Sequence, residues 1–128
     1  MIAAATTALS GLLAQSDRVA GAASNLANQR SVGALSGSPA AYQPVAVGTV
    51  AQAGGGVRAT SRPLSQPTVP EYDPSSVNAD AGGMVAAPNV DQTGDLLTLV
   101  SASNAYKTNL AVLKTADEMT RSALNLTA

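Results

Sequence analysis

The distribution of proline divides the chain into two ends that can be helical and a middle that cannot. All seven prolines lie between Pro39 and Pro88, so none lies in the first 38 or the last 40 residues. Proline removes a backbone donor and clashes with the preceding turn, which breaks a helix interior. Nine of the eleven glycines also fall in or beside the middle. We therefore expect three segments: an N-terminal helix over 1–30, a middle segment over 31–90 and a C-terminal helix over 91–128.

The N-terminal segment carries a stripe of residues at a seven-residue spacing, which is typical of a helix that packs against another helix. Two of its eight positions are Ala and one is Ser, so the stripe is thin and the helix needs a partner. Gly11 and Gly21 each cost about 1 kcal/mol relative to Ala in a helix, which indicates loose packing alone or close approach by another backbone. The stripe consists of Ile2, Leu9, Ser16, Ala23 and, interleaved with them, Ala5, Leu12, Val19 and Leu26.

The C-terminal segment, from about Asp91 to Leu126, repeats this pattern and predicts a second long helix. Asp91 and Asp95 lie near its start and Arg121 near its end, as the helix dipole favours. Beyond Leu113 the stripe shifts, which changes the local winding of a coiled coil. The heptad positions are Leu96, Ser103, Leu110 and Leu99, Tyr106, Leu113, followed by Ala116, Met119, Ala123 and Leu126.

The middle segment contains two short runs that alternate in the manner of strands, 45–50 and 57–60, around a glycine-rich turn at 53–56. This pattern predicts a small β-hairpin. The stretch from Pro63 to Pro88 carries five prolines, and we expect it to be extended and ordered only by contact with something else. The expected fold class is mainly α: long terminal helices packed as an antiparallel coiled-coil-like pair, with a small β-hairpin and an extended Pro/Gly-rich arm between them.

Composition limits both the core and the partners. Ala supplies 26 of the 58 hydrophobic residues, and Phe, Trp and Cys are absent. Because Ala buries little apolar area, we expect a free monomer to be marginally stable. The net charge is -1, so no basic field exists to attract nucleic acid, and no apolar run is long enough to insert directly into a membrane.

Candidate catalytic and metal-binding residues are few. The chain has no His, the commonest general acid and base. Asp73 and Asp80 weakly resemble a calcium loop, but we favour solvated loop carboxylates. Ser103 and Lys107 share a helix face, and we favour a packing Ser beside a solvated Lys over a nucleophilic pair, because nothing nearby would desolvate the Lys. We expect no enzyme activity and no catalytic, cofactor or metal site.

Motifs near both ends resemble those of the bacterial flagellar axial proteins, the rod, hook and hook-associated family. The N-terminal motif covers 10–18 and 23–28, and the C-terminal motif covers 101–110 and 112–119. In the middle, 54–58, 71–74 and 78–90 are similar to the proximal rod proteins of the FlgC type, with the stretch ending in Pro88, Asn89 and Val90 as the most specific element.

This resemblance implies a structural subunit arranged helically around an export channel in the periplasmic rod of the basal body. It implies export by the flagellar type III system without a cleaved signal. That is compatible with the N-terminus, whose first basic residue is Arg18 and which we interpret as mature helix. The implied partners are other copies of the chain, other rod proteins, the rod-base adaptor and the distal rod.

The expected assembly surface combines both helical stripes, within and between subunits. Asn25 and Asn28 lie off the N-terminal stripe, and we expect interchain hydrogen bonds from them unless they are solvated or cap the helix end. The alternative function is a non-polymeric helical adaptor that binds one partner helix through the same stripes. The expected interface residues are Leu9, Leu12, Val19, Asn25, Leu26, Asn28, Leu96, Leu99, Tyr106, Leu110, Leu113 and Met119.

Overall fold

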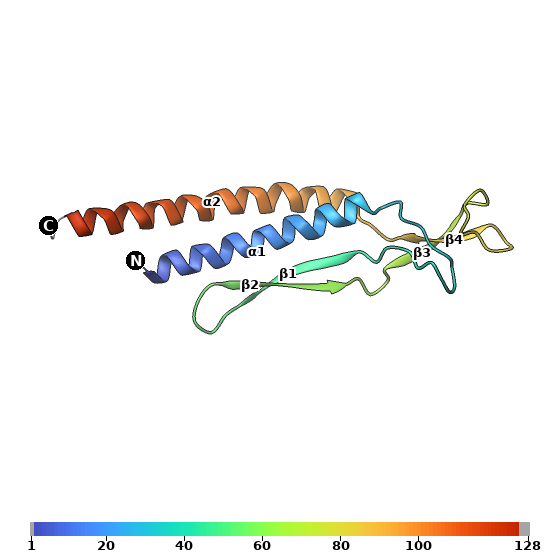
Figure 1. Ribbon diagram of the computed structural model, residues 1–128, viewed down its shortest axis with the longest axis horizontal. Coiled ribbons are helices and arrows are strands. Elements are labelled where there is room, and N and C mark those ends of the chain that lie inside the picture. The colour runs from blue at the N-terminus through green and yellow to red at the C-terminus, as the bar shows by residue number, and fades with distance from the viewer. Residues whose placement is uncertain (1, 126–128) are drawn as a thin grey trace. The chain divides into compact units, whose positions relative to one another are not determined.

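The computed structural model describes residues 2–125, and contains two long helices with two small sheets between them in the sequence (Figure 1). The fold is mainly helical, as expected, and the part of the prediction that concerns Leu126 lies outside the described residues. The elements are α1 (Ile2–Ala27), β1 (Val45–Ala51), β2 (Val57–Pro63), β3 (Thr68–Tyr72), β4 (Met84–Pro88) and α2 (Gln92–Asn125).

The described residues form two compact units. The first unit contains residues 2–20, 47–60 and 98–125, and the second contains residues 21–46 and 61–97. Each unit therefore combines segments that are distant in sequence. Both helices contribute to both units, and the units are described separately below.

A glycine allows α1 and α2 to approach closely in the first unit. Gly11 is buried, and a Cβ atom at this position would lie 2.7 Å from Nδ2 of Asn109 on α2. Gly11 thus permits the close approach of α2, which is one of the two interpretations of this glycine that the sequence allows. The other buried residues of the helices in this unit are Ala8, Leu12 and Ala14 on α1 and Ala102 and Ala116 on α2.

The stripe that α1 buries inside the chain differs from the predicted heptad stripe. Of the eight predicted positions only Leu12 is buried, whereas Ile2 is 83% and Leu9 48% exposed. The close approach of the helices is at Gly11, and the residues buried with it are mostly Ala, so the larger side chains remain exposed. The heptad spacing predicted the helix correctly, but most of the stripe is not buried within the single chain.

The β1–β2 hairpin confirms the strands predicted before and after the glycine-rich turn. Gly55 and Gly56 adopt φ angles of 90° and 84°, which favour glycine, and the amide of Gln52 donates to the carbonyl of Gly56 at 3.1 Å. The amide of Val57 donates to Oγ of Ser10 at 3.1 Å, so the turn end of the hairpin is attached to α1 (Figure 1).

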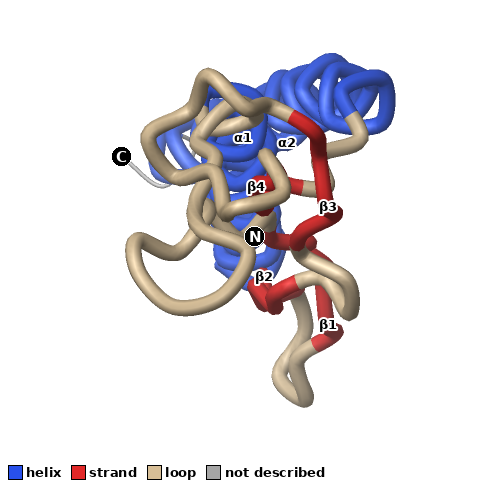
Figure 2. The backbone as a smooth tube through the Cα atoms, turned by 90° about the vertical axis from the view of Figure 1, so that its right-hand side faces the viewer, coloured by secondary structure: helices blue, strands red, loops and turns tan. Residues whose placement is uncertain are grey.

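The second unit contains a hairpin where the sequence predicted an extended arm, so this part of the prediction is wrong. Strands β3 and β4 pair antiparallel from Thr68 opposite Pro88 to Tyr72 opposite Met84 (Figure 2). Strand β4 is the buried strand of this unit, and Val85 is fully buried. On its other edge, Ala86 exchanges two backbone hydrogen bonds of 2.9 Å with Gly33.

Pro70 explains why the sequence pattern failed at β3. Pro70 lies opposite Ala86, whose N–H and C=O groups both bond to Gly33 and therefore point away from β3. Pro70 thus occupies a non-hydrogen-bonded position of the ladder, where its missing donor costs nothing. Proline is excluded from the middle of a sheet, but an edge strand tolerates it at every second position.

Gly33 provides the first test of this fold. A Cβ atom at Gly33 would overlap the backbone of Ala40 and Ala41, while a Cβ at Gly54 meets nothing within 4 Å. We expect Gly33→Ala to destabilise the second unit by about 2–4 kcal/mol, because backbone must move to accommodate it. Urea unfolding followed by tyrosine fluorescence measures the loss, with Gly54→Ala as the matched control. Equal stability of the two variants would contradict the close packing at Gly33.

Candidate assembly surface

The helices expose most of their large apolar side chains. Val100 is 62%, Leu13 61% and Met119 56% exposed, in a chain whose buried hydrophobic residues are mostly Ala. Large exposed apolar areas are typical of surfaces that contact other molecules. The exposed large hydrophobic residues of the helices are Ile2, Leu9, Leu13, Leu96, Leu97, Val100, Tyr106, Leu110, Val112, Met119 and Leu124.

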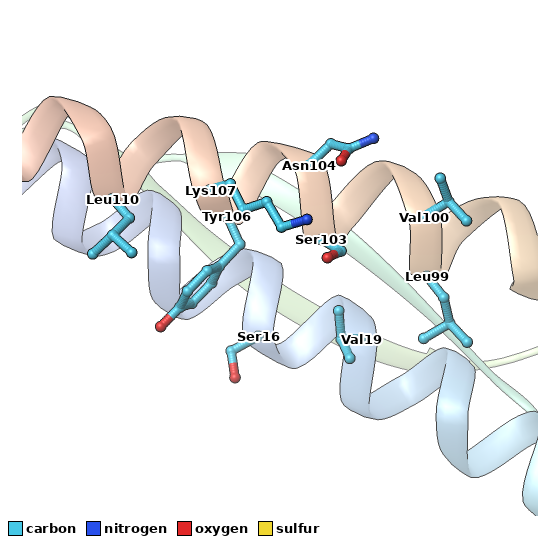
Figure 3. Close-up of a pocket in the computed structure, with 9 residues that line it drawn as sticks. All are labelled: Ser16, Val19, Leu99, Val100, Ser103, Asn104, Tyr106, Lys107 and Leu110. Carbon is cyan, nitrogen blue, oxygen red and sulfur yellow. The ribbon is translucent and has the colours of Figure 1, made fainter.

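An open groove of about 850 Å³ lies between the two helices of the first unit, and we call it the interhelical groove (Figure 3). Leu99, Tyr106 and Leu110 extend from α2 toward α1, and Val19 extends from α1 toward α2. Val100 and Asn104 point away from α1 at the rim. The complete lining is Ser16, Val19, Leu99, Val100, Ser103, Asn104, Tyr106, Lys107 and Leu110.

A second, smaller groove of about 310 Å³ brings the start of α1 next to the later part of α2. Its walls are mostly apolar, and Asp117 provides a carboxylate at its edge, where Arg121 bonds to it at 2.9 Å. Both partners of this ion pair are largely exposed, so it adds little stability. The lining residues are Ile2, Ala5, Thr6, Leu9, Leu113, Ala116, Asp117 and Thr120.

Six of the twelve residues expected at the interface line these two grooves. Four of the others differ in exposure, since Leu12 is buried, Leu26 is half-buried, and Leu96 and Met119 are exposed. Leu13 and Val100 were missed because they lie off the heptad positions, although Leu13 follows Leu9 at the helical spacing of four residues. Leu9 and Leu113 line the smaller groove. The interhelical groove is lined by Val19, Leu99, Tyr106 and Leu110.

Asn25 is at the centre of a polar network within the second unit. It is only 4% exposed, and its Nδ2 donates to the carbonyl of Val45 at 3.0 Å and to Oδ1 of Asp95 at 3.3 Å. Its Oδ1 accepts from the amide of Val45 and from the hydroxyl of Tyr42, both at 3.0 Å. The Tyr42 hydroxyl also bonds to Oγ of Ser24 at 3.0 Å. One side chain thus connects the end of α1, the start of β1 and the start of α2.

This network corrects the expectation of an interchain hydrogen bond from Asn25. An amide side chain has two donors and two acceptor lone pairs, and all four are used inside the chain. Asn28 instead matches the alternative of a helix-end cap, because its Nδ2 donates to the carbonyl of Ser24 at 2.9 Å. Sequence reasoning missed the network because its partners lie 17 to 70 residues away.

The start of α2 is fixed by a carboxylate cap. Oδ1 of Asp91 accepts from the amide of Gly94 at 3.0 Å, the N-cap arrangement that satisfies a free helix donor. A Cβ atom at Gly94 would collide with this carboxylate. Burial raises the pKa of Asp95 above its ordinary value of 3.8, the hydrogen bond from Asn25 opposes this rise, and the charge of Asp91 adds to it.

The weaker candidates for chemistry have structural roles. Oδ1 of Asp73 accepts from Oγ of Ser75 at 2.6 Å, and Oδ1 of Asp80 accepts from the amides of Gly82 and Met84, so both carboxylates support turns. Within residues 2–125, no group of three potential metal ligands was found. In the same part of the chain, neither helix combines the length and apolarity needed to cross a membrane.

Comparisons with known proteins give a consistent family. The family model for the C-terminal region of flagellar basal-body rod FlgEFG proteins matches residues 81–126. The "Flagellar basal-body rod protein FlgC" of Salmonella typhimurium is 42% identical over 121 residues, which cover 91% of this chain and 90% of that protein. The protein of the same name from Agrobacterium fabrum is 33% identical over 129 residues, covering 97% and 93%.

The chain belongs to the FlgC family of flagellar basal-body rod proteins. It is accordingly a structural subunit of the basal-body rod, and the resemblance of the terminal motifs is confirmed. The matched family region includes β4 and the whole of the described α2, and with them one wall of the interhelical groove.

Removing the amide of Asn25 tests the polar network. Asn25→Ala leaves the half-buried backbone groups of Val45 without their partner and removes one of the two hydrogen bonds of the Tyr42 hydroxyl, so we expect a loss of about 2–4 kcal/mol in unfolding free energy. Asn28→Ala is the matched control, with an expected loss under about 1 kcal/mol, because its half-buried amide donates one bond at the helix end. Urea unfolding measures both, and a larger effect at Asn28 would refute the network's role.

The raised pKa of Asp95 predicts a pH dependence of stability. The folded state favours the protonated form, so this stabilising contribution is complete below pH 3.8 and is lost as the pH rises through the raised pKa. Asp95→Asn keeps an oxygen that accepts from Asn25 but carries no charge. We expect the stability of the variant relative to wild type to increase from pH 3.8 toward neutrality. A difference that does not change with pH would show that Asp95 is not destabilised by burial.

Proposed function

We propose that this rod subunit polymerises helically through its terminal helices, forming part of the drive shaft and export channel of the flagellum. The observation that carries the proposal is the contrast between the two sides of the helix pair. The residues that the two helices of the first unit bury are Gly11, four Ala and Leu12, while Leu13, Tyr106 and Leu110 are 61%, 40% and 49% exposed. A chain selected to fold alone would bury its largest side chains first.

Energetics favour assembly as the event that completes the core. Full burial of a Leu, Ile or Val side chain contributes about 1.5–3 kcal/mol, whereas Ala contributes much less. Several exposed side chains on each copy therefore offer a driving force comparable with the whole stability of a small domain. We infer that the free subunit is loosely helical and that its helices become ordered as they dock into the growing rod.

The contacts of the first unit support an antiparallel, coiled-coil-like course for the two helices. Ile2 of α1 shares a groove with Thr120 of α2, while Val19 shares the other groove with Leu99. Residues thus meet in opposite chain order along the pair. We propose that the chain functions as two terminal helical segments, 1–30 and 91–128, joined by a middle segment over 31–90 that carries both hairpins.

The remaining parts of the proposal follow from family membership. The subunit lies in the periplasmic rod and reaches it through the flagellar type III system without a cleaved signal. Its partners are other copies, other rod proteins, the rod-base adaptor and the distal rod. It acts as a non-enzymatic structural protein without cofactor, and it neither binds nucleic acid nor inserts into the membrane.

The competing function is a non-polymeric adaptor that binds one partner helix. The interhelical groove also suits this function, because a single amphipathic helix could fill it. The two functions differ in stoichiometry. An adaptor stops at a defined complex, whereas a rod subunit continues to add copies.

Sedimentation and circular dichroism of the purified protein over a range of concentrations test the proposal. We expect large assemblies to appear with increasing concentration, together with an increase in helical ellipticity per residue. Leu110→Asp should suppress both changes, because assembly would bury an unpaired carboxylate, while Ser101→Asp at an exposed position outside both grooves is the control. A cooperatively folded, protease-resistant monomer at every concentration would refute polymerisation through the helices.

A further inference from the structure

We propose that the interhelical groove of one copy receives the N-terminal half of α1 from the next copy. This inference rests on the proposed polymerisation and specifies which two surfaces meet. The inserted surface consists of Ile2, Leu9 and Leu13, and we call it the α1 ridge. We assign a second copy of this chain, rather than a different protein, to the groove.

The α1 ridge lies on the side of α1 opposite Gly11, and two of its residues, Ile2 and Leu9, also line the smaller groove beside α2. A helix turns by about 100° per residue, so Ile2, Leu9 and Leu13 project to the same side, opposite the buried Gly11. Ile2 is 83% and Leu13 61% exposed, although each is a large apolar residue. The ridge is thus an apolar surface that nothing in the described chain covers completely.

Charge selects the α1 ridge over the other exposed apolar surfaces. The first charged side chain of the sequence is Asp17, so the ridge can enter a groove without dehydrating a charged side chain. The later part of α2 exposes apolar residues as well, but it also carries two exposed ion pairs, Lys114 with Glu118 and Arg121 with Asp117. Burying these groups would cost more than the apolar contact gains.

The groove and the α1 ridge also agree in length and lining. Ile2–Leu13 and Leu99–Leu110 each span eleven residue steps, about 16 Å along a helix. The groove offers Leu99, Tyr106 and Leu110 as walls, with Ser103 at its surface (Figure 3). Lys107 is the single charged residue of the lining, and its aliphatic stem can pack while its ammonium group stays in water.

The pairing of two different surfaces explains an open polymer. A groove that receives a ridge is a heterologous contact, because each copy offers one surface and leaves the other free. Such contacts repeat indefinitely and generate a helix when rotation and translation do not close a ring. A groove that packs against the same groove of another copy would instead close a twofold dimer and stop growth.

Cysteine cross-linking tests the inference directly, because the native chain has no Cys. Leu13→Cys protein is mixed with Ser103→Cys protein under assembly conditions, and disulfide-linked dimers are quantified after mild oxidation. The matched control replaces Ser103→Cys by Ser101→Cys, an equally conservative change at an exposed position of α2 that lies outside the groove. We expect the groove pair to cross-link at least about tenfold more than the control pair, since a disulfide requires closely placed Cβ atoms.

The outcomes separate this inference from the proposed function. Assemblies that form with equal yields for both pairs, or with Ser103→Cys linked mainly to itself, would overturn the ridge-in-groove contact and leave polymerisation standing. Absence of assemblies in the sedimentation of the same mixtures would overturn the proposed function, and this inference with it. Selective linkage of Leu13→Cys to Ser103→Cys in sedimenting assemblies supports both.

Discussion

The close contact between α1 and α2 in the first unit is the constraint on which the rest of the assembly surface depends. Gly11 faces Asn109 so closely that a single Cβ atom would collide with the amide. The other residues that the two helices bury in this unit are four Ala and Leu12, so the helices bury little apolar area. The larger side chains therefore remain at the margins, where they form grooves and exposed stripes. The packing that joins the helices therefore leaves large apolar side chains of the subunit exposed.

The second unit has a different source of order, the polar network around Asn25. The Asn25 amide makes four hydrogen bonds, two with Val45 and one each with Tyr42 and Asp95. In the same unit, β4 is paired with β3 on one edge and with Gly33 on the other. Hydrogen bonds of this kind specify geometry strongly while contributing modest net stability. A chain with few large apolar residues can thus hold a defined shape at one unit while it exposes Leu and Tyr side chains on its helices.

Sequence reasoning succeeded where a local pattern determines the outcome. Heptad spacing predicted both helices, alternation around the glycines predicted the β1–β2 hairpin, and terminal motifs identified the family. It failed where long-range contacts decide. The buried face of α1 depends on how closely Gly11 and Asn109 approach, and the β3–β4 hairpin depends on the edge position of Pro70. The four hydrogen bonds of Asn25 also depend on the folded chain, because no sequence periodicity relates residues that are 17 to 70 positions apart.

The central claim is that the exposed apolar side chains of the helix pair become buried when copies assemble. Hydroxyl-radical footprinting with mass spectrometry measures this directly, by comparing the reactivity of individual side chains in dilute subunit and in sedimented assemblies. The account predicts that Leu13, Tyr106 and Leu110 become strongly protected on assembly. Unchanged reactivity of these three side chains in assembled protein would contradict it.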